Sequence, residues 1–117
     1  MNLNNFTIDT ELLARAIVAY GDQAQVDVAI EEMAELTKAL LKVRRAKTHE
    51  DTVAAKEKVL EEIADVYIMV LQMTIIFDGG PSSSRVPAFI FEKMERLRER
   101  LQQRHDAVMK HWQGQQT

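Results

Sequence analysis

The sequence predicts an all-α protein, and more specifically a four-helix bundle subunit. Aromatic residues make up only 6% of the chain, so it is poor in the residues that favour β-strands. With 4 Gly and 2 Pro, it has too few turn residues for a loop-rich β-sandwich or barrel. Apolar residues recur at helical spacing in four segments, near residues 10–20, 23–45, 52–77 and 86–112. We expect a single all-α domain over residues 1–117, because this length leaves no room for a second core.

The first two predicted helices meet at a glycine. Asp9 or Thr10 can cap a helix that ends before Gly21, and glycine is the usual residue just past a helix end. The second helix runs from residue 23 to about residue 45. Its apolar residues follow helical spacing and are expected to face the core: Val26, Ile30, Met33, Thr37 and Leu40.

The third predicted helix contains the most apolar segment of the chain. A polar connector, residues 46–51, precedes it and offers Thr48 or Asp51 as the cap. The first half of the helix is amphipathic, whereas residues 66–77 are apolar nearly all round. A helix that is apolar on every side must be covered on every side, which three other helices of one small domain can hardly do. We therefore expect a homo-oligomer, a dimer or a tetramer, that assembles through this helix.

A loop separates the third helix from the last one. Residues 78–84, with sequence DGGPSSS, form the clearest break in the chain. Pro87 suits the first turn of the helix that follows, because its missing N–H is not needed there. The apolar stripe of this helix consists of Ile90, Met94, Leu97, Leu101, Val108 and Trp112.

Composition excludes several classes of function. The net charge of −3 argues against a broad nucleic-acid-binding face, which needs clustered Lys and Arg. The absence of cysteine removes disulfides, thiolate zinc sites and a cysteine nucleophile. The N-terminus has no basic segment followed by an apolar one, as a signal peptide would. The longest nearly apolar run is residues 66–77, whereas a membrane span needs about 20 residues. We expect a cytoplasmic protein that contacts neither membrane nor nucleic acid.

Two similar acidic motifs stand out, EEMAE at residues 31–35 and EEIAD at residues 61–65. Each contains one pair of carboxylates spaced i, i+3: Glu32 with Glu35, and Glu62 with Asp65. Side chains at this spacing are neighbours on a helix, with Cβ atoms about 5–6 Å apart. The pairs are mutually repulsive unless something positive lies between the carboxylates.

Apolar residues flank both acidic pairs, which predicts that the carboxylates are partly covered. Val28 and Ala39 lie beside the first pair, and Met69 and Met73 share a strip with the second. Partly buried carboxylates need a partner or they become protonated. Four carboxylates on facing helices could bind divalent cations, and oxygen ligands alone favour Mg²⁺, with Mn²⁺ as a second choice. A di-iron centre is disfavoured because no Glu-x-x-His pair is present. The alternative is that both pairs belong to solvated helix faces.

The paired motifs resemble the signature of the all-α nucleoside triphosphate pyrophosphohydrolases. This superfamily includes the MazG-like proteins, the dimeric dUTPases, the dCTP pyrophosphatases and the phosphoribosyl-ATP pyrophosphohydrolases. The stretches YGDQAQVDVAIEEMAELTKALLKVRR and EEIADVYIMVLQM look like the MazG-like subgroup, and the match covers about residues 19–100. The resemblance implies that the chain is a hydrolase acting on phosphoric anhydrides, converting (deoxy)nucleoside triphosphates to monophosphate and pyrophosphate in nucleotide-pool housekeeping.

The resemblance also implies which residues do the chemistry. The family's Mg²⁺ ligands map onto four carboxylates here, which are also the catalytic candidates: Glu32, Glu35, Glu62 and Asp65. The bound ions would neutralise the triphosphate and lower the pKa of the attacking water. Glu35 is the candidate that accepts the proton of this water. The neighbouring Glu31 and Glu61 support the ligands or face solvent.

Substrate-binding candidates lie outside the acidic motifs. Lys93 and Arg96 lie on the last helix at i, i+3 spacing, where the family uses basic residues against the phosphates; the alternative is an exposed helix with a Glu92–Arg96 ion pair. Gln25 precedes the first motif by one or two helical turns, where the resembling subgroup often has Gln. It is a candidate for contacting the base or ribose, and the alternative is a solvated side chain.

Two other functions compete with a MazG-like nucleotide pyrophosphohydrolase. Phosphoribosyl-ATP pyrophosphohydrolase shares the acidic pattern. A non-catalytic helical association module would account for the heptad-like stripe Ile90, Met94, Leu97 and Leu101. Base and sugar preference cannot be derived from residue spacing.

Overall fold

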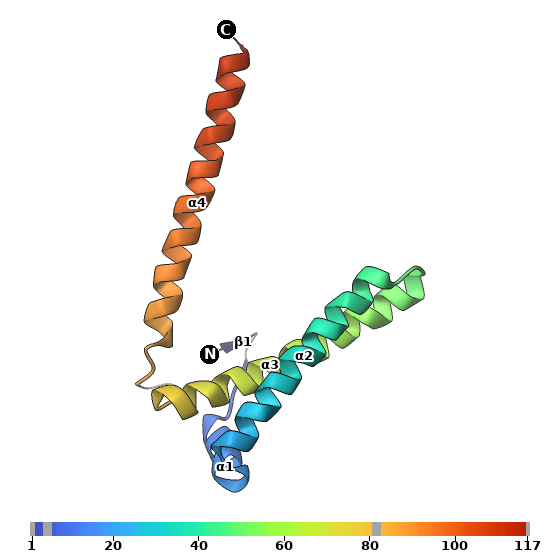
Figure 1. Cartoon of the computed structure of the whole chain (residues 1–117), viewed down its shortest axis with the longest axis vertical. Coiled ribbons are helices and arrows are strands. Elements are labelled where there is room, and N and C mark those ends of the chain that lie inside the picture. The colour runs from blue at the N-terminus through green and yellow to red at the C-terminus, as the bar shows by residue number, and fades with distance from the viewer. Residues whose placement is uncertain (1, 4–5, 81–82, 117) are drawn as a thin grey trace. The chain divides into compact units, whose positions relative to one another are not determined.

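The protein is described by a computed structural model that covers residues 2–3, 6–80 and 83–116. These residues form four helices (Figure 1): α1 (Thr10–Tyr20), α2 (Asp22–Arg45), α3 (His49–Asp78) and α4 (Val86–Gln115). The predicted all-α class and the four helices are confirmed. Two short strands precede α1, β1 (Asn2–Leu3) and β2 (Phe6–Thr7), and they pair antiparallel. The chain divides into two compact units, Met1–Ser84 and Arg85–Thr117.

Local signals account for where the helices of the first unit begin and end. The side chain of Asp9 caps α1 by accepting a hydrogen bond from the backbone N–H of Leu12 at 3.0 Å. Thr48 caps α3 in the same way, accepting from Asp51 N–H at 3.0 Å, so this helix begins three residues earlier than the predicted residue 52. Gly79 ends α3 with a left-handed backbone conformation, φ 77°.

The core of the first unit is the antiparallel pair of α2 and α3, with α1 packed against both (Figure 1). Leu13 and Ile17 are the buried residues of α1. On α2 the buried residues are Gln25, Ala29 and Ala39. On α3 they are Glu62, Met69 and Gln72. Polar side chains therefore make up half of the buried positions on the two longest helices of this unit.

The predicted core face of α2 is wrong. Ile30, Met33 and Leu40 are all about half exposed. The buried face of α2 instead contains the residues one position earlier in the sequence, such as Ala29 and Ala39. Alanines at positions 29 and 39 explain the difference, because the distance at which two helices pack depends on the side chains at the contact. The apolar stripe of α2 is left on an exposed side of the helix pair.

The second unit is the single helix α4. Its predicted apolar stripe is continuous along the helix, and each of these side chains is at least half exposed: Ile90, Met94, Leu97, Leu101, Val108 and Trp112. An ion pair joins Arg96 to Glu92 at 3.2 Å, which is the alternative stated above for the phosphate-binding role of Arg96. Among the helices that the structure describes, none is both long and apolar enough to cross a membrane.

Candidate functional site

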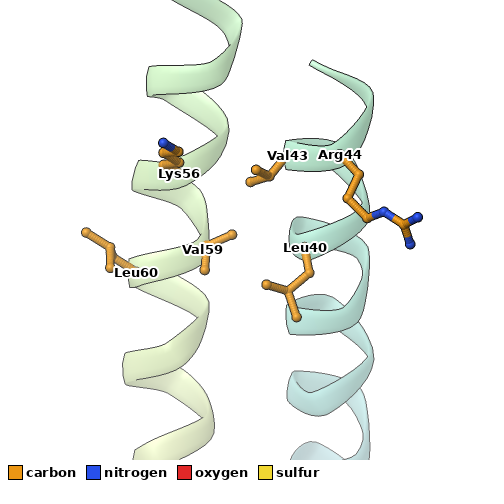
Figure 2. A pocket seen from close by; sticks show the side chains of 6 residues that line it. All are labelled: Leu40, Val43, Arg44, Lys56, Val59 and Leu60. Atoms are coloured by element: carbon orange, nitrogen blue, oxygen red, sulfur yellow. The ribbon is translucent and has the colours of Figure 1, made fainter. Parts of the chain in front are cut away.

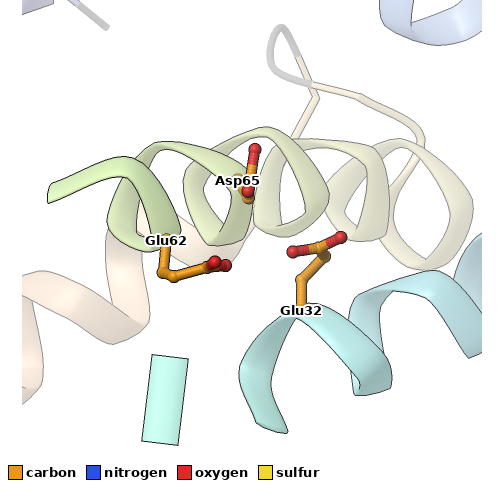
Figure 3. A group of neighbouring side chains, drawn as sticks. All are labelled: Glu32, Glu62 and Asp65. Carbon is orange, nitrogen blue, oxygen red and sulfur yellow. The ribbon is translucent and has the colours of Figure 1, made fainter. Parts of the chain in front are cut away.

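Three of the four predicted carboxylate ligands lie close together where α2 and α3 pack against each other. Glu32 extends from α2, and Glu62 and Asp65 extend from α3 (Figure 3). One carboxylate oxygen from each residue lies within 4.8 Å of those of the other two. We call Glu32, Glu62 and Asp65 the acidic cluster. It forms because the i, i+3 spacing places Glu62 and Asp65 on one side of α3, where antiparallel packing brings Glu32 opposite them.

Glu62 is the most deeply placed member of the acidic cluster. The residue is only 5% exposed. Its Oε1 atom lies 3.1 Å from the Nζ atom of Lys58, one helical turn earlier on α3. Its Oε2 atom is buried and has no hydrogen-bond partner among the described residues. A buried acceptor without a partner costs about 1–3 kcal/mol, and a charged one more, so this carboxylate is strongly disposed to bind a cation.

Burial and mutual repulsion make the acidic cluster electrostatically unfavourable in the absence of a cation. The pKa of Glu32 is raised above its ordinary value, chiefly by burial and then by the charges of Asp65, Glu62 and Glu35. Conversely, the pKa of Lys58 is raised, because its ammonium donates a hydrogen bond to Glu62 and lies close to that carboxylate. Lys58 is the only basic side chain within ion-pair distance of the acidic cluster among the described residues.

The donor set of the acidic cluster fits a small hard cation. Carboxylate oxygens are the ligands that Mg²⁺ and Mn²⁺ prefer, and Mg²⁺ is usually held by a few carboxylates together with waters and substrate phosphates. The unpartnered Oε2 atom of Glu62 points to the same conclusion, because cation binding would satisfy it. Asp65 is exposed, which leaves one side of the cluster open to a substrate.

Glu35, the fourth predicted ligand, lies outside the acidic cluster. Its side chain is 50% exposed, and its carboxylate is 3.8 Å from the Nζ atom of Lys38. The prediction that both acidic pairs are covered therefore holds for Glu32 and Glu62, whereas Glu35 and Asp65 are exposed. The neighbouring Glu31 and Glu61 are exposed as well, which agrees with the solvent-facing alternative.

The substrate-binding candidates have different environments. Gln25 is only 6% exposed, so the solvated alternative for this residue is wrong. It shares the buried face of α2 with Glu32, two helical turns away. Lys93 and Arg96 are exposed on α4, in the second unit, and their role toward phosphates stays a prediction.

Lys58 is a member of the site that the sequence analysis missed. It contacts both Glu61, at 3.5 Å, and Glu62, at 3.1 Å. Lys58 lies four residues before Glu62, and side chains at i, i+4 spacing are neighbours on a helix. This spacing could have predicted the ion pair between the two residues.

The raised pKa of Glu32 predicts a specific pH dependence of stability for the protein freed of metal by a chelator. Because the folded-state pKa lies above the unfolded value of 4.5, the folded state binds this proton more tightly. Protonated Glu32 therefore adds to the free energy of unfolding below about pH 4.5, and this contribution is lost as the pH rises through the pKa that Glu32 has in the folded state. Glu32→Gln, which is always neutral, is expected to lack this loss. Urea unfolding of both proteins from about pH 4 to about pH 7 measures the difference.

The control for this measurement is Glu31→Gln, which removes an exposed carboxylate from the same turn of α2; the charge of Glu31 is the smallest of the causes that raise the pKa of Glu32, so this variant should keep most of the loss. If the difference in unfolding free energy between the wild type and Glu32→Gln stays constant over this pH range, the pKa of Glu32 is not raised in the folded state.

Comparison with known proteins adds no assignment to this geometry: no family model, no curated protein and no solved structure matches the chain.

Proposed function

We propose that this protein is a metal-dependent nucleoside triphosphate pyrophosphohydrolase of the MazG-like kind, which hydrolyses (deoxy)nucleoside triphosphates to the monophosphate and pyrophosphate. The observation that carries the proposal is the acidic cluster, in which three carboxylates from two helices lie within 4.8 Å of one another. The buried Oε2 atom of Glu62 makes this arrangement costly unless a cation binds there. The spacing of the two acidic motifs and their resemblance to the MazG-like signature support the choice of reaction.

The residues of the site have distinct tasks under this proposal. Bound Mg²⁺ would neutralise charge on the triphosphate and lower the pKa of a water molecule. Glu32, Glu62 and Asp65 would hold the cation, and the exposed side of Asp65 would admit the substrate. Glu35 is one helical turn from Glu32 and is the candidate to accept the proton of the attacking water. Lys58 would contribute the basic side chain nearest to the phosphates.

We further propose that the chain completes a four-helix bundle by assembling into a homo-oligomer in the cytoplasm. Several large apolar side chains of α3 are exposed, among them Ile68, Val70 and Phe77. The apolar stripe of α4 is exposed along the whole helix. Burying such side chains typically contributes about 1.5–3 kcal/mol each, which favours association into a dimer or a tetramer.

The exposed stripe of α4 also favours a second candidate, an association module without catalytic activity. Such a module has no reason to retain a buried carboxylate oxygen without a partner beside two further carboxylates. Phosphoribosyl-ATP pyrophosphohydrolase activity is the alternative within the same chemistry, since it would use the same acidic cluster.

Pyrophosphate release from a panel of canonical and modified (deoxy)nucleoside triphosphates, with phosphoribosyl-ATP included, tests the proposal. We expect release that requires Mg²⁺ or Mn²⁺ and stops when a chelator is added. Release from phosphoribosyl-ATP alone would establish the alternative substrate. No release from any of these compounds by folded protein would contradict the proposal and favour the association module.

A further inference from the structure

Two open depressions, each of about 550 Å³, lie on the surface of the α2–α3 pair near the turn that joins these helices. The first is an apolar groove lined by Leu40, Val43, Val59 and Leu60, with Arg44 and Lys56 at its edge (Figure 2). We call the second depression the basic pocket. It is lined by three cations, one carboxylate and three alanines: Lys42, Arg45, Lys58, Asp51, Ala46, Ala54 and Ala55. No residue lines both of these depressions. Successive residues of a helix point about 100° apart, so neighbours such as Arg44 and Arg45 can line different ones.

The basic pocket has the chemistry of an anion site. Lys42 and Arg45 are exposed, so their charged groups are available to a ligand, whereas Lys58 is more than half exposed but already pairs with Glu61 and Glu62. Among the described residues, neither Lys42 nor Arg45 forms an ion pair with an acidic side chain. Because Lys58 is paired with Glu61 and Glu62, the cations of this pocket that are unpaired among the described residues are Lys42 and Arg45. They repel each other, and the carboxylate of Asp51 can offset only one of these two charges. An anion with several negative charges would relieve this repulsion.

Lys58 connects the basic pocket to the acidic cluster. It lines the pocket, and its Nζ atom lies 3.1 Å from Oε1 of Glu62. Glu62 is one helical turn further along α3, a rise of about 6 Å. The basic pocket therefore continues the acidic cluster along the α2–α3 pair, toward the turn that joins the two helices.

We propose that the basic pocket binds the terminal two phosphates of the substrate and, after hydrolysis, the pyrophosphate product. The inference rests on the proposed function, since a cation at the acidic cluster would hold the phosphate that is attacked. It gives the substrate a direction: the phosphate tail extends toward the α2–α3 turn, and the nucleoside lies on the other side of the acidic cluster. Gln25, two helical turns from Glu32 in that opposite direction, lies on the nucleoside side.

The chain contains a matched pair of variants for testing the proposal. Lys42→Ala combined with Arg45→Ala removes two cations from the basic pocket. Arg44→Ala combined with Lys56→Ala removes two cations from the edge of the apolar groove at the same end of the same helices. Both changes have the same effect on net charge, and Arg44 and Arg45 both lie in the last turn of α2. Circular dichroism establishes that both variants are folded.

Calorimetric titration with inorganic pyrophosphate in the presence of Mg²⁺ is the decisive measurement. We expect the affinity to fall at least about tenfold in the basic-pocket variant and less than about twofold in the apolar-groove variant. Asp51→Asn, which removes the one carboxylate of the pocket, is expected to tighten binding. Inhibition of turnover by pyrophosphate should weaken in the basic-pocket variant, whereas inhibition by the nucleoside monophosphate should not change.

An equal loss of pyrophosphate affinity in the two double variants, or no loss in either, would overturn the proposal. This outcome is distinct from failure of the proposed function, which the substrate panel detects as absence of turnover. The titration needs no turnover, so it decides the role of the basic pocket in either case.

Discussion

Replacing Glu62 by Gln is expected to reduce triphosphate hydrolysis by more than about 100-fold, since even residues that only support metal ligands cost about 10–100-fold when they are changed. The substitution keeps the size of the side chain but removes the charge from the one carboxylate that, among the described residues, has a buried oxygen without a partner. It also removes the charge that Lys58 pairs with at 3.1 Å. Steady-state rates of pyrophosphate release at saturating Mg²⁺ measure the effect.

The fold of Glu62→Gln should remain intact, because the substitution removes repulsion from the acidic cluster rather than a packing contact. Glu61→Gln is the matched control: it removes a carboxylate from the same turn of α3, 64% exposed and also paired with Lys58. We expect this variant to retain most of the activity, since exposed ion pairs contribute only about 0–1 kcal/mol. Equal rates for the wild type and Glu62→Gln would remove the acidic cluster from the mechanism.

Glu35→Gln tests the fourth carboxylate and is expected to abolish turnover as well. Glu35 is outside the acidic cluster, but its charge already raises the pKa of Glu32. Its ion pair with Lys38, at 3.8 Å and half exposed, is of a kind that contributes little to stability, so the side chain can rotate toward the cluster at small cost. Normal activity of Glu35→Gln would contradict the four-carboxylate assignment.

Addition of Mg²⁺ should stabilise the folded protein markedly. A ligand that binds only the folded state contributes about 2.7 kcal/mol at a concentration of 100 times its Kd. For this protein the gain should be accompanied by relief of the repulsion among Glu32, Glu62 and Asp65. Calorimetric thermal unfolding in EDTA and in increasing Mg²⁺ measures the rise of Tm.

The same unfolding experiment on the variants assigns the effect to the acidic cluster. Glu62→Gln should lose most of the Mg²⁺-dependent rise in Tm, whereas Glu61→Gln should keep it. In EDTA, Glu32→Gln should unfold at a higher temperature than the wild type at neutral pH, because it lacks the destabilising charge. If Mg²⁺ leaves the Tm of the wild type unchanged, the acidic cluster is not a metal site and the association module gains support.

The helices could be predicted from the sequence because the signals that form them are local. Asp9 and Thr48 accept hydrogen bonds from backbone N–H groups three residues later, and Gly79 provides the left-handed conformation that ends α3. Each signal acts within one turn of helix. The segments were therefore correct to within a few residues at each end.

The candidate site could be predicted only in part. The i, i+3 spacing correctly indicated that Glu62 and Asp65 lie on one side of α3, but only the structure shows that Glu32 lies close to both of them. The spacing did not separate Glu32, which is partly buried, from Glu35, which is half exposed, because both belong to the same spacing pattern. Nor did it find the basic pocket, whose cations come from two helices and share no motif.

Local sequence was sufficient for the all-α class, the four helices and the two acidic pairs, since helical periodicity determines which residues share a side of a helix. Only the tertiary structure decided which side of each helix packs against a neighbouring helix. On α2 the apolar stripe with Ile30 and Met33 is exposed, and the alanine-containing face with Ala29 and Ala39 is buried. The physical reason is that both of these stripes of α2 have helical periodicity, so periodicity alone cannot choose between them. The close approach of α3 favours burial of the stripe with the small alanine side chains. This selection turns Glu32 toward Glu62 and Asp65 and creates the acidic cluster.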